Sequence, residues 1–227
     1  SALITDGAMN GTRRNSLTNP EPMKPGEVYE LKIPMAPTGW VIPAGHRLRL
    51  AISSADFPNL WPTPYRATNR VYRGAAAHLS RVVLPVVAKS TVAPPEFLPP
   101  PELRRLVTSS GGLPPIQQVL YDQITNVATV LNRSGGGTTV LDEQLGSVTG
   151  QSEFRCSASA DNPAQASIVG KHKIAFRRED GDIEVTAEST IRSTETHFHV
   201  TINIHVTRNG LTFFQKQWLL TEPRRLL

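Results

Sequence analysis

The sequence predicts an all-β protein, and two features of the chain support this prediction. Apolar and polar residues alternate in several short runs, which is typical of strands with one buried face. Nineteen prolines and sixteen glycines lie largely between these runs, where turns are needed. A chain of 227 residues with 39% hydrophobic residues can bury one large β core or two small ones. A helical bundle is therefore disfavoured.

The first half of the chain carries three strand-like segments. Residues 28–35 alternate, with Leu31 and Ile33 on one face and Glu30 and Lys32 on the other. Residues 46–53 repeat the pattern after a Pro-Ala-Gly turn, and residues 79–87 are rich in Val and Leu. Pro85 indicates a strand end or an edge in the third segment.

His46 and Ser53 raise the question of catalysis, because both belong to the second segment. His46 shares the parity of the leucines, so we expect it at the buried mouth of the strand. Ser53 lies on the polar side, and no G-x-S-x-G motif occurs in the chain. Both residues are therefore interpreted as part of the fold, and we assign no catalytic residue.

The second half predicts an antiparallel meander with one apolar and one polar face. Residues 118–143 indicate a strand, a turn at the glycines 135–137 and a second strand. Further strands are expected at 150–159, 172–178, 182–193, 196–206 and 211–220. Turns separate them at residues 160–166, at 179–181 and at Asn209-Gly210, the strongest hairpin signal in the chain.

Two groups of residues could bind metal, and neither supports a site. His197 and His199 share the polar face of one strand, but His205 lies about 20 Å further along it. The alternative, a solvated polar face, is favoured. Cys156 has no cysteine partner for a disulfide or a zinc site, so we expect a buried structural thiol. We expect no metal and no cofactor.

A proline-rich segment divides the chain. Residues 92–105 contain five prolines and predict an extended connector between residues 1–91 and 106–227.

The formal net charge is +5, but the basic residues are scattered in pairs, so we expect no nucleic-acid partner. No run is apolar and long enough to cross a membrane, and no signal peptide is visible, so a cytoplasmic location is favoured.

The loop 56–74 is the candidate functional segment, because long irregular loops are often interfaces. Phe57, Trp61 and Tyr65 could contact a partner domain or stack on a sugar. Alternatively, they close the end of a β-sandwich.

Several of these segments together resemble one family. The pattern is an Asn10-x-x-x-Arg14 segment, then P-G-E-x-Y at 25–29, then P-x-G-H-R-L-R-L-x-I-S-S-x-D-x-P at 43–58. Over residues 3–87 the chain resembles the C-terminal domain of the bacterial CocE/NonD serine hydrolases, which include Xaa-Pro dipeptidyl-peptidases and cocaine esterase. Residues 106–227 resemble the β extension of some members.

The resemblance implies a jelly-roll β-sandwich of the galactose-binding-like type, followed by the meander. It also implies that an α/β-hydrolase domain upstream carries the Ser-Asp-His triad, so this chain would be inactive alone. The chain begins inside the family's domain, so we expect an incomplete sandwich with an open edge, and with it self-association. The alternative is a stand-alone carbohydrate-binding or structural module.

Overall fold

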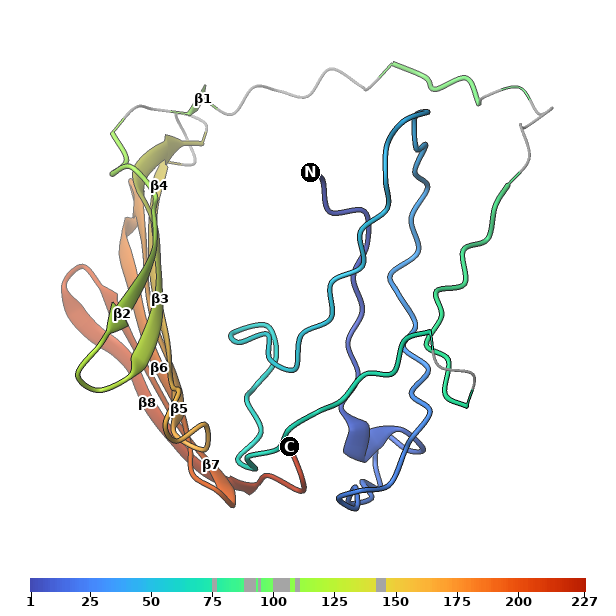
Figure 1. Ribbon diagram of the computed structural model, residues 1–227. Coiled ribbons are helices and arrows are strands. Elements are labelled where there is room, and N and C mark those ends of the chain that lie inside the picture. The colour runs from blue at the N-terminus through green and yellow to red at the C-terminus, as the bar shows by residue number, and fades with distance from the viewer. Residues whose placement is uncertain (75–76, 88–92, 94, 100–106, 109–110, 142–145) are drawn as a thin grey trace.

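The computed structural model describes residues 1–74, 77–87, 93, 95–99, 107–108, 111–141 and 146–227. Within these residues it is an all-β chain, whose one helical element is the 3-10 turn η1, Gly11–Arg13. Figure 1 shows two parts, an extended N-terminal part without strands and a curved sheet. The two parts approach each other near the C-terminus. The expected connector at 92–105 lies mostly outside the described residues.

The sheet contains eight antiparallel strands. They are β1 Val107–Thr108, β2 Ile116–Asp122, β3 Val127–Val140, β4 Ser147–Ser159, β5 Ala166–Arg178, β6 Gly181–Ser193, β7 His197–Arg208 and β8 Leu211–Pro223. Strands β3 to β8 follow one another in space in chain order, and β1 and β2 both pair with β3. This confirms the predicted antiparallel meander.

One face of the sheet is apolar, and we call it the dry face. Its register places Cys156 beside Ile168, Ile168 beside Ile191, and Ile191 beside Val200. On the opposite, wet face the ion pair Lys171–Glu188 joins directly opposed residues of β5 and β6 at 3.4 Å. The ion pair Lys173–Glu184 joins diagonal neighbours of the same two strands at 2.9 Å. The alternation along each strand is therefore the two-faced pattern predicted from the sequence.

The turn predicted at the glycines 135–137 is wrong. These glycines lie inside β3, where the register against β4 shifts between Gly135 and Thr138. The turn lies earlier, because Asp122 Oδ1 accepts the backbone N–H groups of Ile124 and Thr125 and Asn126 adopts a φ of 53°. These bonds form an Asx turn at Asp122, so the chain reverses direction there and not at the glycines. The hairpin at Asn209-Gly210 is confirmed, with φ angles of 51° and 78°.

The strands predicted at 28–35, 46–53 and 79–87 do not form a hydrogen-bonded ladder. The structure assigns no strand to any described residue of 1–87. A strand needs a neighbour to accept and donate its backbone hydrogen bonds. One such bond reaches this region from the N-terminal segment, where Ala36 N donates to Asp6 O at 2.9 Å.

Candidate functional site

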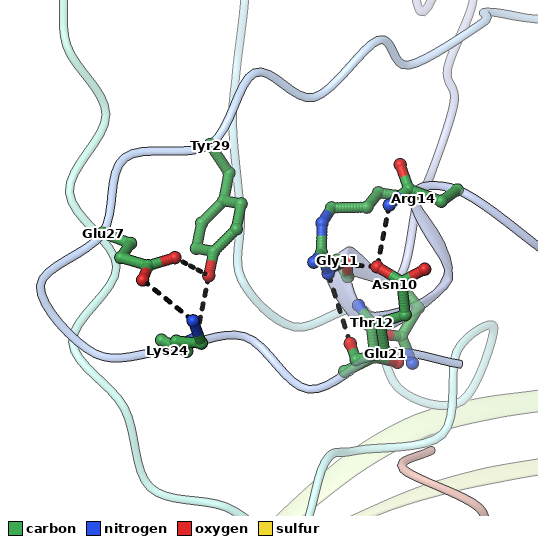
Figure 2. Close-up of polar contacts among 9 residues, drawn as sticks. Asn10, Gly11, Thr12, Arg14, Glu21, Lys24, Glu27 and Tyr29 are labelled. Atoms are coloured by element: carbon green, nitrogen blue, oxygen red, sulfur yellow. Dashed lines mark hydrogen bonds and ion pairs between the residues drawn. The ribbon is translucent and has the colours of Figure 1, made fainter. Parts of the chain in front are cut away.

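The Asn10-x-x-x-Arg14 segment folds into a small polar cluster (Figure 2). Asn10 Oδ1 caps η1 by accepting Thr12 N at 3.0 Å, as short polar residues do at helix starts. Arg14 donates to Gly11 O at 3.0 Å and forms an ion pair with Glu21 at 3.3 Å. The arginine therefore ties η1 to the segment that leads into the P-G-E-x-Y sequence.

The P-G-E-x-Y segment completes the same cluster. Tyr29 donates its hydroxyl to Glu27 at 2.7 Å and accepts Lys24 N at 2.9 Å (Figure 2). The Arg14 guanidinium lies 4.7 Å from the centre of the Tyr29 ring, a cation–π distance. The residues that carry the sequence pattern thus hold each other, which is a structural role.

Trp61 connects the N-terminal part to the sheet. Its indole Nε1 donates to Ser193 Oγ at 2.9 Å. Its ring meets Phe198 edge-on with centroids 5.3 Å apart, and Phe57 meets it edge-on at 5.7 Å. We call this contact, with Arg224, the Trp61 seam. It lies at the end of the dry face, because Ser193 and Phe198 are opposed on β6 and β7.

Ser193 is the buried polar centre of the seam. Its hydroxyl donates to Ala164 O at 2.6 Å and accepts Ala166 N at 3.2 Å in addition to the indole of Trp61. Ser193 is 6% exposed, so these bonds satisfy a hydroxyl that burial would otherwise penalise.

Arg224 closes the seam from the C-terminal side. Its guanidinium donates to Thr194 O at 2.9 Å and also to Pro62 O, and it lies 5.1 Å from the centre of the Phe198 ring. The residue is 2% exposed, and burial lowers its pKa from the ordinary arginine value. A buried cation held by two carbonyls and an aromatic ring fixes the chain around it.

The last residues extend this attachment. Thr12 Oγ1 donates to Leu226 O at 3.1 Å, so the C-terminal tail reaches η1. Arg225 and Leu226 hold the left-handed φ angles of 47° and 64° that turn the tail in this direction. The seam and the tail together join residues more than 200 positions apart.

The three loop residues singled out from the sequence differ in their surroundings. Phe57 contacts Trp61, and Trp61 contacts the sheet, whereas Tyr65 is 55% exposed. Trp61 therefore makes an intramolecular contact. The sequence did not identify Ser193, Phe198 and Arg224 as its partners, because a contact across 132 residues leaves no local pattern.

The histidines and Ser53 take no part in the seam. Ser53 Oγ donates to Ala55 O at 2.6 Å, which is a local turn bond. His46 is exposed, so its expected burial at the mouth of a strand is wrong. In the part of the chain that the structure describes, no group of three or more His, Cys, Asp or Glu is placed to hold a metal ion. No described helix is long and apolar enough to cross a membrane.

In the described residues, the geometry defines a β portion in which a tryptophan joins an N-terminal part to a sheet. Comparison with known families agrees, because residues 1–84 match the X-Pro dipeptidyl-peptidase C-terminal non-catalytic domain. This part of the chain is therefore similar to the C-terminal domain of the CocE/NonD hydrolases.

Curated relatives match the same fraction of the chain. The cocaine esterase of Rhodococcus sp. (strain MB1 Bresler) is 33% identical over 100 residues, which is 38% of this chain and 17% of that protein. Two mycobacterial proteins assigned as serine esterases, from Mycobacterium bovis and Mycobacterium tuberculosis, are each 42% identical over 104 residues. Those matches cover 38% of this chain and 16% of each relative. No solved structure matched.

Proposed function

We propose that this chain is the C-terminal β portion of a CocE/NonD-type serine hydrolase, and that an α/β domain elsewhere in the same protein cleaves an ester or an Xaa-Pro peptide bond. The match of residues 1–84 to a non-catalytic domain family carries the proposal. Such hydrolases act through a nucleophilic serine in a G-x-S-x-G elbow, and this sequence has no such motif. The β portion braces the catalytic domain and borders the entrance to its active site.

Exposed apolar residues supply a surface for that domain. Leu31, Ile33 and Met35 are 38%, 44% and 40% exposed, and they alternate along one face of their segment. In the next segment Leu48, Leu50 and Ile52 are 53%, 55% and 61% exposed. Exposed apolar residues gathered in this way along two segments are typical of a protein interface. Tyr65 extends the candidate interface to the loop 56–66.

The division of the chain follows from the same proposal. Residues 1–91 form part of the sandwich domain, 92–105 the connector and 106–227 the extension. The Trp61 seam supports a fixed arrangement of the first and third parts, because Trp61 and Ser193 come from either side of the connector.

The proposal is tested first by reading the coding sequence upstream of Ser1. We expect an in-frame α/β domain with a G-x-S-x-G elbow. A start codon close upstream would contradict the proposal and favour a self-standing binding or structural module.

The second test uses the full-length protein and an activated ester such as p-nitrophenyl acetate. Replacing the elbow serine by alanine should abolish hydrolysis. Ile33→Ser should lower the midpoint of thermal inactivation, because it weakens the apolar contact between the domains. Val41→Ser, at a residue that is 86% exposed and outside the alternating stripe, is the matched control and should leave that midpoint unchanged. Equal effects of both variants would contradict the interface.

A further inference from the structure

The exposed edge strand β8 supports an inference that goes beyond the hydrolase assignment. Strand β8 is the last strand in the sheet order, and all of its residues from Leu211 to Pro223 are exposed. An edge strand presents unpaired N–H and C=O groups that can pair with another strand. Proteins usually protect long edges with charges, prolines or bulges, so the protection of β8 decides whether it can pair.

A bulge and a proline protect the two ends of β8. A bulge lies near its start, since Val206 pairs with Phe214 and Thr207 pairs with Thr212, which leaves Phe213 out of register. Pro223 lies at its last position. Between them, residues 214–222 contain no proline and two charged residues, Lys216 and Glu222.

Both faces of β8 carry exposed apolar side chains among polar ones. Trp218 and Leu220 lie on the dry face, opposite Ile202 and Val200. Leu219 lies on the wet face opposite Thr201, and it is 68% exposed. The two neighbouring strands, β6 and β7, carry only polar residues on that face, so an exposed leucine there departs from their pattern and indicates a covered position.

We propose that β8 pairs in an antiparallel manner with β8 of a second copy of this chain, about a two-fold axis at Leu219, to form a continuous sheet across a homodimer. In a two-fold pair, residues directly opposite each other must face the same side of the sheet, so the axis passes through one residue position. A closed two-fold interface of this kind is the commonest form of homo-oligomer.

Charge complementarity selects Leu219 as that position. Counting outward from Leu219, Lys216 of one copy lies opposite Glu222 of the other, and the two-fold axis creates this pair twice. Both residues belong to the dry face, because they oppose Ile204 and Phe198 on β7. Trp218 then lies opposite Leu220, which is a favourable aromatic–aliphatic pair.

The neighbouring registers are less favourable. An axis at Trp218 would place Lys216 opposite Leu220 and Glu222 opposite Phe214, so each charge would face an apolar side chain. An axis at Gln217 would bring Thr212 and Phe213 into the pairing, where the bulge interrupts the ladder. The interface is a single strand pair, so the dimer should be weak and concentration-dependent.

Sedimentation velocity over a concentration series of the 227-residue chain tests the proposal. The unchanged chain should form dimers reversibly as its concentration rises. Leu219→Lys places two lysines together at the axis and should weaken dimerisation about tenfold or more. Leu211→Lys is the matched control, since Leu211 is 76% exposed on the same strand but lies beyond the bulge. A monomer at every concentration, or a dimer that tolerates Leu219→Lys, overturns the proposal.

A charge exchange tests the register. Lys216→Glu alone brings two pairs of like charges together and should weaken the dimer by about fivefold or more. The double variant Lys216→Glu with Glu222→Lys recreates both ion pairs and should restore most of the affinity. Thermal melts of each variant separate a folding defect from a loss of association. Failure of the double variant to recover, although it is folded, overturns the Leu219 register.

Discussion

The indole Nε1 of Trp61 donates a 2.9 Å hydrogen bond to the hydroxyl of Ser193, which follows it by 132 residues. The same hydroxyl donates to Ala164 O and accepts Ala166 N, so a single serine links the loop, the β4–β5 turn and the end of β6. The N-terminal part of the chain is therefore attached to the sheet through a satisfied buried polar group and an aromatic cluster.

Trp61→Ala should destabilise the protein by about 3 kcal/mol, the low end of the range for truncating a packed aromatic side chain. The variant loses the edge-on contacts with Phe57 and Phe198 and leaves the Ser193 hydroxyl with one partner fewer. Urea denaturation measures the loss. The matched control is Trp40→Ala, because Trp40 is 52% exposed. Equal losses would contradict the seam.

The same variant distinguishes a seam from a sugar site. If Trp61 stacked on sugar rings, Trp61→Ala would abolish carbohydrate binding while stability stayed close to that of the unchanged protein. We expect the opposite result: a loss of stability, with no carbohydrate binding by either protein in a glycan array.

Arg224→Lys should cost about 2 kcal/mol, although it keeps the positive charge. A lysine ammonium cannot reproduce the fork that donates to Thr194 O and Pro62 O while stacking over Phe198. The carbonyls of Thr194 and Pro62 then lose a donor. Arg225→Ala is the control, because the side chain of Arg225 is exposed. A loss from Arg225→Ala as large as that from Arg224→Lys would contradict the specific role of the Arg224 guanidinium.

The sheet was predictable because strict alternation is a local signal. The run from His197 to Val206 assigns each side chain to a face without knowledge of its neighbours, and the pairing of β7 places Phe198, Val200 and Ile202 on the dry face as the run predicts. The Asn209-Gly210 turn is equally local, since left-handed φ angles favour these two residues.

The errors have physical causes of their own. The glycines at 135–137 look like a turn in the sequence, yet a bulge also needs glycine, and only the pairing of β3 with β4 shows which occurs. The segment 46–53 has the alternation of a strand, but the pattern cannot supply the neighbour that a ladder requires. The Trp61 seam could not be predicted from local sequence patterns, because residues such as Arg224 and Pro62 are 162 positions apart.

Gly135→Ala tests the bulge in β3. Gly135 has a φ of 101°, and a Cβ there would lie 2.1 Å from Gly150 O, so both the backbone conformation and the space exclude a side chain. We expect a loss of more than about 1 kcal/mol, or failure of the β3–β4 pair to form. In the control Gly150→Ala the added Cβ would meet nothing within 4 Å, and urea denaturation should find it close to neutral. If both alanines were tolerated, the bulge would be misplaced.

Cys156 should be an unreactive thiol in the folded protein. It is 7% exposed on the dry face, and burial raises the pKa of its thiol above the ordinary value. The raised pKa lowers the reactive thiolate fraction and burial keeps the reagent from the sulfur, so a thiol reagent such as DTNB should react more slowly before unfolding than after it. The control is Leu211→Cys in a Cys156→Ser background, which should react at the rate of a free thiol because residue 211 is exposed.

The raised pKa of Cys156 also determines how the free energy of unfolding changes with pH. The folded state keeps the thiol neutral, whereas the unfolded state ionises it once the pH passes the ordinary cysteine pKa. The contribution of Cys156 to stability is therefore complete below that pH and declines as the pH rises toward the raised pKa of the folded state. Cys156→Ala should flatten the decline in the free energy of unfolding at alkaline pH, measured by urea denaturation at a series of pH values. An unchanged decline in Cys156→Ala would show that other groups produce it.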